Sequence, residues 1–190
     1  MRKLFILVCS VFSVVCFGQS KYELGMQKAL QQWQSGQPKE AIAILDRIAV
    51  SDQENWIPVY YKVFIEVTGG LNNPKGTDVE DIVERNRLLI EQWLEKGGAE
   101  WYVLKGMNET LELITDPMSK GMTQSPIINK AYETAVALDP TNPRAVYSLA
   151  SFHLNSAKFM KVDVAYYCTM VEKSITLFDQ QKSDVSFYPS

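Results

Sequence analysis

The spacing of the apolar residues is the feature that most constrains the fold of this chain. From about residue 21 to residue 178 they recur three and four positions apart, which is the period of helices with one buried face. Helix start and stop signals divide this stretch into short segments. The pattern predicts an all-α fold, and 190 residues suit one domain.

The helix boundaries can be placed from capping residues. Thr77 and Glu80 form a capping box, and Ser125-Pro126 and Asn142-Pro143 each read as an N-cap followed by proline at the first helical position. The expected helices lie near 24–33 (closed by Gly36), at 39–49, after Asn55, from Thr77 to Gly97, at 99–114, after Ser125, after Asn142 and at 162–178. Residues 179–190 are expected to form a flexible tail.

The segment 59–67 is ambiguous by composition. Its sequence, VYYKVFIEV, is rich in β-branched and aromatic residues and nearly alternates, which is equally typical of a strand. A helix is favoured because the phase of the repeat described next requires one there.

The clearest repeated unit covers residues 131–150. Ala135, Leu138, Pro140 and Asn142 form the end of one unit, and Val146, Leu149 and Ala150 begin the next helix. This stretch resembles the tetratricopeptide repeat, and a second match runs from Gly36 to Ile48. The resemblance covers most of 21–178 and implies a right-handed superhelical array of about four antiparallel helix pairs. The alternative is an unrelated helical bundle.

Two stretches depart from the repeat length. The segments 69–76 and 116–124 fall at the turns within two successive helix pairs, so they are expected to be long loops lying side by side on one edge. Loops on a rigid scaffold often carry function, although surface loops also tolerate neutral insertions.

The N-terminus has the pattern of a secretory signal peptide over residues 1–18. Arg2 and Lys3 precede an apolar run at 4–15, and Cys16 and Gly18 occupy the −3 and −1 positions of a cleavage site. Export to the periplasm or the outside is therefore expected for residues 19–178 and the tail. Cys168 would then be the only cysteine left, so an intrachain disulfide is excluded. It is most simply interpreted as a small buried side chain. Lipidation of Cys16 is disfavoured by Val14 and Val15.

Composition and motifs argue against an enzyme. There is one histidine, His153, expected to pack in a helix, and the sequence lacks metal-ligand spacings, phosphate loops and nucleophile motifs. The carboxylates at 78–84 suit the first turn of a helix. No cofactor, metal or transmembrane span is expected, and the net charge of −3 gives no footprint for nucleic acid.

The expected role is therefore a protein–protein interaction module or assembly scaffold whose partner is another protein or peptide. Stacked pairs form a concave face mainly from their first helices. The resemblance implies that the groove-facing residues are Glu23, Met26, Leu30, Trp33, Arg144, Tyr147, Ser151 and Asn155. The alternative is a small-ligand or glycan receptor that uses the loops 69–76 and 116–124.

Overall fold

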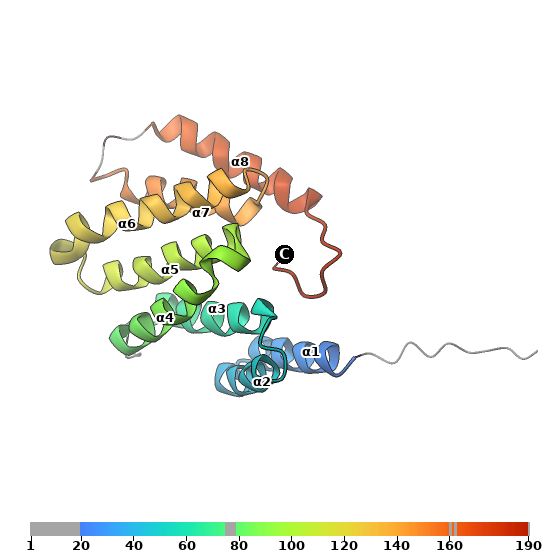
Figure 1. Ribbon diagram of the computed structural model, residues 1–190. Coiled ribbons are helices and arrows are strands. Elements are labelled where there is room, and N and C mark those ends of the chain that lie inside the picture. Colours follow the sequence, from blue (N-terminus) through green and yellow to red (C-terminus); the bar gives the residue numbers. More distant parts are fainter. Residues whose placement is uncertain (1–19, 75–78, 160, 162, 190) are drawn as a thin grey trace, which may run out of the picture.

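The computed structural model describes residues 20–189 except 75–78, 160 and 162, and this part of the chain holds eight α-helices (Figure 1). The helices are α1 (Lys21–Gln34), α2 (Pro38–Ser51), α3 (Trp56–Asn72), α4 (Val79–Gly97), α5 (Ala99–Thr115), α6 (Pro117–Leu138), α7 (Pro143–Ser156) and α8 (Val164–Gln180). No strand occurs among the described residues. The all-α prediction is confirmed, and 59–67 is helical.

The helices stack as four pairs in chain order. Each odd-numbered helix packs against the even-numbered helix that follows it, and α3 and α7 also contact α5. Figure 1 shows the pairs rising from α1 and α2 to α7 and α8, with the short connections that antiparallel neighbours need. This arrangement is compatible with tetratricopeptide-like units.

Two of the caps expected from the sequence are present in the structure, and the one expected at Ser125 is not, because Ser125 lies inside α6. The Asn55 side chain accepts a hydrogen bond from the Ile57 amide at 3.1 Å, and the Asn142 side chain accepts one from the Ala145 amide at 3.0 Å. Thr77 and the signal peptide predicted for residues 1–18 lie outside the described residues.

The predicted loop at 116–124 is wrong. The side chain of Asp116 accepts a hydrogen bond from the Ser119 amide at 3.1 Å, and Pro117 occupies the first helical position, so α6 begins nearly ten residues earlier than expected. Pro126 lies inside this helix rather than at its start. Residues 69–72 likewise form the last turn of α3. The pair of long loops proposed for a receptor site is therefore absent from the described chain.

An aromatic cluster fills the centre of the array. The Trp101 ring of α5 lies 6.4, 6.1 and 6.3 Å, centroid to centroid, from the rings of Trp56, Tyr60 and Trp93. Trp101 is completely buried. Because these rings come from α3, α4 and α5, the cluster fixes the second pair against the third.

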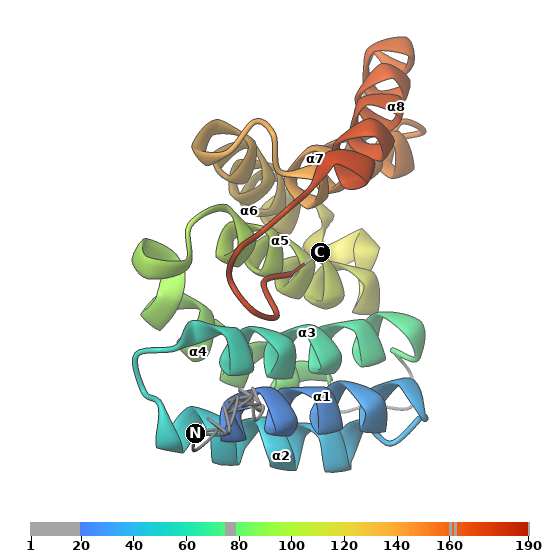
Figure 2. The same cartoon turned by 90° about the vertical axis from the view of Figure 1, so that its right-hand side faces the viewer.

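Residues 181–189 follow a defined course where the sequence suggests a flexible tail. They leave α8, cross in front of α5 and approach α3 (Figure 2). Phe187 and Tyr188 are half-buried, and Pro189 is buried. The reason is chemical: the segment carries two aromatic rings that pack on rings of the first two helix pairs. We call residues 181–189 the C-terminal segment.

No helix in the described part of the chain combines the length and the apolar character needed to cross a membrane.

Two helical glycines should respond in opposite ways to alanine. A Cβ on Gly106 would lie 2.3 Å from the buried Tyr132 ring, whereas a Cβ on Gly121 meets nothing within 4 Å. We expect Gly106→Ala to lower the free energy of unfolding by about 1–3 kcal/mol through overpacking. Gly121→Ala should raise it by about 0.5–1 kcal/mol through helix propensity. Urea denaturation measures both, and equal shifts would contradict the packing of α5 on α6.

Candidate binding face

The first helices of the four pairs, α1, α3, α5 and α7, share one side of the array. Figure 2 looks onto this side, with the C-terminal segment lying across it and the end of α8 in front of α7. We call it the first-helix face. Residues of three of its helices contact the C-terminal segment, namely Tyr22 of α1, Trp56 of α3 and Arg144 of α7.

A buried ion pair lies behind this face. The carboxylate of Glu100, on α5, is completely buried and accepts hydrogen bonds from Arg144 Nε at 2.9 Å and Arg144 Nη2 at 2.6 Å. Tyr60 Oη donates to it at 3.2 Å and Asn142 Nδ2 at 2.6 Å. The network therefore links α3, α5 and the start of α7. Four donor atoms from three side chains satisfy a carboxylate that would otherwise be costly to bury.

The charges in this network perturb one another. Burial acts to lower the pKa of Arg144, but the hydrogen bond and charge of Glu100 outweigh it, so the pKa is raised. Burial, followed by the charge of Glu100, raises the pKa of Tyr60 well above its ordinary value. Arg144 is thus cationic and Tyr60 neutral, which is the state in which both donate to Glu100.

Arg144 also holds the C-terminal segment. Its Nη1 donates to Gln181 Oε1 at 3.1 Å and its Nη2 to the Pro189 carbonyl at 2.6 Å. The guanidinium lies 5.9 Å from the centroid of the Phe178 ring. One side chain therefore connects the buried carboxylate, the end of α8 and the end of the C-terminal segment.

Two aromatic contacts hold the other part of the segment. The Phe187 ring meets the Tyr22 ring edge-on at 5.9 Å, and the Tyr188 ring meets the Trp56 ring edge-on at 5.7 Å. Edge-to-face pairs at these separations are favourable beyond the area they bury.

The predicted groove residues of α1 are mostly engaged within the fold. Met26 is completely buried in the first core cluster, so its placement in the groove is wrong; it lies on the side of α1 that packs against the body. Glu23 forms a capping box with Ser20. Leu30 and Trp33 are half-buried, and the Trp33 ring packs on Phe64 at 5.6 Å.

The predicted groove residues of α7 are more accessible to solvent than those of α1. Tyr147 is 47% exposed, Asn155 is exposed and Ser151 is half-buried. Asn155 Nδ2 donates to Ser151 Oγ at 3.3 Å, which places these two side chains together. Arg144 is engaged as described above. The N-terminal part of the face is thus filled, whereas α7 offers an aromatic ring and polar groups to solvent.

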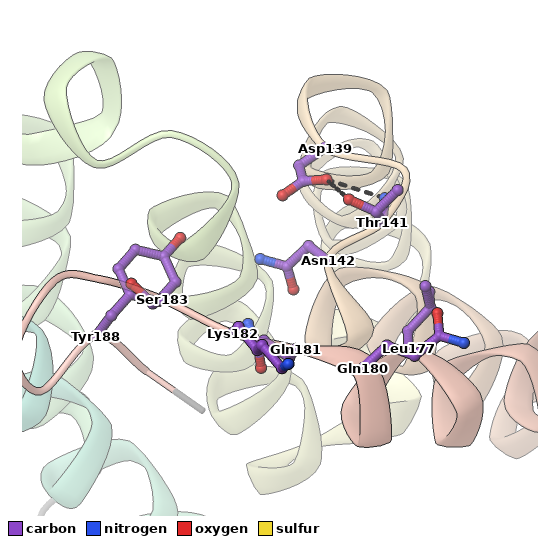
Figure 3. A pocket seen from close by; sticks show the side chains of 9 residues that line it. All are labelled: Asp139, Thr141, Asn142, Leu177, Gln180, Gln181, Lys182, Ser183 and Tyr188. Atoms are coloured by element: carbon purple, nitrogen blue, oxygen red, sulfur yellow. Dashed lines mark hydrogen bonds between the residues drawn. The ribbon is translucent and has the colours of Figure 1, made fainter.

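A cavity of about 420 Å³ lies between the C-terminal segment and the turn that joins α6 to α7 (Figure 3). It is lined mainly by polar side chains, and Tyr188 stands at one side of it. On the opposite side, the Asp139 carboxylate accepts a hydrogen bond from the Thr141 hydroxyl at 2.7 Å. The segment therefore leaves unfilled space beside its own docking position.

The remaining residues with reactive side chains are His153, Cys168 and the acidic residues of α4. The His153 ring stacks on Tyr167 at 4.2 Å, and its Nε2 pairs with Asn129 Oδ1 at 2.7 Å, as expected for a packed histidine. Cys168 is exposed, which corrects the expectation that it is buried. Glu84 pairs with Arg87. Among the described residues no three histidine, cysteine or acidic side chains are grouped to hold a metal ion.

Sequence reasoning missed Glu100 and the C-terminal segment. Glu100 looks like an ordinary first-turn acid, because a pattern shows its helix but not the arginine 44 positions later that neutralises it. The adjacent aromatic residues Phe187 and Tyr188 were the available signal for the segment, since two rings in a solvated tail are unusual.

These features define an all-α array of helix pairs with a partly covered face. A comparison with protein-family models finds no match, and no curated protein matches the sequence.

Solved structures do match the fold. A chain described as the HusA haemophore from Porphyromonas gingivalis has a TM-score of 0.78 and 20% sequence identity, covering 90% of this chain and 88% of that one. At this identity the likeness establishes a shared fold over nearly the whole length. A second chain, described as the MamA RS-1 ArsTM double mutant, has a TM-score of 0.37 and 17% identity, covering 87% of this chain and 99% of that one. A TM-score this low does not establish a shared fold.

Proposed function

We propose that the protein is a non-enzymatic binding protein that takes a segment of another polypeptide on its first-helix face. One observation carries the proposal: this face already holds a polypeptide segment, the chain's own residues 181–189. The contacts are of the kind that recognise peptides, namely edge-on ring pairs and a cationic donor to a backbone carbonyl.

The uncovered part of the face offers further anchors for such a ligand. Tyr147 presents a large ring with a polar end, a residue type enriched among binding hot spots. Asn155 and Ser151 supply amide and hydroxyl groups nearby. We further propose that the protein acts after export, because residues 1–18 have the charged, apolar and small-residue zones of a signal peptide.

The proposal is tested by selecting peptides from a displayed library and measuring their affinity for variants. We expect Tyr147→Ala to weaken binding at least about 10-fold, as for an aromatic anchor. Leu88→Ala is the matched control, because Leu88 is an exposed apolar residue on a second helix, α4. Affinities are measured by fluorescence anisotropy.

Equal affinity of the Tyr147 and Leu88 variants would place the ligand elsewhere. Failure to select any peptide would remove the support for a polypeptide ligand on this face.

A haem ligand is the second candidate. It is favoured by the similarity over nearly the whole chain to a protein described as a haemophore, together with two exposed tyrosines, Tyr147 and Tyr166. A tyrosine phenolate is one of the side chains that ligate haem iron. Neither of the two best-formed cavities of the described residues suits a flat apolar macrocycle, because one is lined mainly by polar groups and the other is smaller and more open. Haemin titration of the same variants, followed by absorbance, separates the two candidates.

A further inference from the structure

We propose that the C-terminal segment is a displaceable occupant of a docking site for another polypeptide, and that this partner supplies two neighbouring aromatic side chains in place of Phe187 and Tyr188. The inference rests on the proposed function and gives its ligand a chemical description. Three independent observations carry it: the contacts of the segment, its backbone conformation and the space beside it.

The contacts define three positions that any occupant would fill. Tyr22 receives one ring, Trp56 receives a second ring, and Arg144 Nη2 donates to a backbone carbonyl at 2.6 Å. The Arg144 side chain is held by Glu100 independently of the segment, through Nε and Nη2. The docking site is therefore built largely by the body of the array and not by the segment itself.

The backbone of the segment is strained at the residue that makes one of these contacts. The Tyr188 amide donates to the Val185 carbonyl at 3.1 Å, which closes a four-residue turn with Phe187 at its third position. Phe187 has φ 60°, a conformation that favours glycine or asparagine over a bulky side chain. Strain of this kind persists only where the surroundings enforce it. A partner that places its rings without a left-handed residue would avoid this cost.

The space beside the segment is incompletely used. The cavity of about 420 Å³ next to Tyr188 is lined, on the side of the array, by Asp139, Thr141 and Asn142 (Figure 3). A partner with polar groups next to its aromatic pair would make hydrogen bonds there that the segment leaves unmade. Strain and unfilled space together make the segment a weaker ligand than an optimal partner.

Competition within one chain has a calculable effect. A segment tethered by a short linker has an effective concentration on the order of 1 mM at its own site. Its presence lowers the fraction of molecules whose site is free, and the apparent affinity for any free peptide falls by the same factor. If the segment binds its own site with an intrinsic dissociation constant of about 10–100 µM, the expected loss is about 10- to 100-fold.

The experiment uses a fluorescently labelled peptide with the sequence of residues 181–190, QKSDVSFYPS, as the probe. Its affinity is measured by anisotropy for the full chain, for a chain truncated after Gln180, and for the double variant Phe187→Ala/Tyr188→Ala. We expect both altered proteins to bind the probe about 10- to 100-fold more tightly than the full chain. A peptide with both aromatic residues replaced by alanine should not bind.

The double variant keeps the test informative should truncation after Gln180 disturb α8. Ser186→Ala is the matched control, because Ser186 is exposed in the same segment; it should bind the probe as weakly as the full chain. The inference is overturned by the absence of probe binding to both altered proteins, or by equal affinity of all four. It is also overturned by full-length dimers that disappear on truncation, since the occupant would then be the segment of a second copy.

The outcome is separable from that of the proposed function. If selected peptides bind through Tyr147 while the tail probe does not bind either altered protein, the function stands and the displaceable segment does not. If no peptide binds in either experiment, both fail.

Discussion

Replacing Arg144 by methionine should lower the free energy of unfolding by about 3–5 kcal/mol. The variant leaves the completely buried Glu100 carboxylate with hydrogen bonds from Tyr60 and Asn142 but without a countercharge. It also removes the hydrogen bonds to Gln181 and the Pro189 carbonyl. Urea denaturation followed by tryptophan fluorescence measures the loss.

Arg85→Met is the control for loss of an ion pair as such. Arg85 pairs with Glu66 at 3.0 Å, but its side chain is 47% exposed, so we expect a loss below about 1 kcal/mol. Adding Glu100→Gln to Arg144→Met should recover part of the loss, because the unpaired buried charge disappears. Similar losses for Arg85→Met and Arg144→Met would contradict the account of the buried pair.

The second large effect is expected at Trp101. Trp101→Ala removes a completely buried ring that touches aromatic rings of α3 and α4, and it should cost about 3–5 kcal/mol. The cavity would open between the second and third pairs, where stiff neighbouring rings cannot collapse into it.

Trp101→Phe is the matched variant, because it keeps an aromatic ring at the same place. It should cost less than half as much, and the indole nitrogen it removes has no hydrogen-bond partner in the structure. Thermal denaturation measured by circular dichroism ranks the two variants. A Trp101→Ala variant as stable as the unmodified protein would show that the cluster does not hold the pairs together.

Local signals were enough to predict most helices. The helix starts marked by Asn55, Asn142 and Pro143 are found where they were predicted. A helix cap depends only on residues two or three positions away, so it can be predicted from the local sequence. The start of α6 was misplaced because two cap–proline pairs compete there. Asp116-Pro117 begins the helix, and Pro126, although it has no amide hydrogen to donate, is accommodated within it.

Long-range features of the site lay beyond the sequence. Tyr147 is exposed, as a groove-facing residue must be, but its role in binding stays a prediction. The prediction for Met26 is wrong because this residue lies on the side of α1 that packs against α2 and α3, in the first core cluster. The ion pair of Glu100 and Arg144 joins residues 44 positions apart, and no local pattern reports such a contact.

The route of the C-terminal segment has a consequence for folding. In an array whose pairs touch only their neighbours, stability is a sum of local terms and unfolding can begin at either end. Here Phe187 and Tyr188 join the last pair to the first and second pairs. The two ends of the array are thereby in contact, so that local unfolding at one end is opposed by contacts with the other. The chain must also close a long loop, between α1 and the C-terminal segment, to complete the native state.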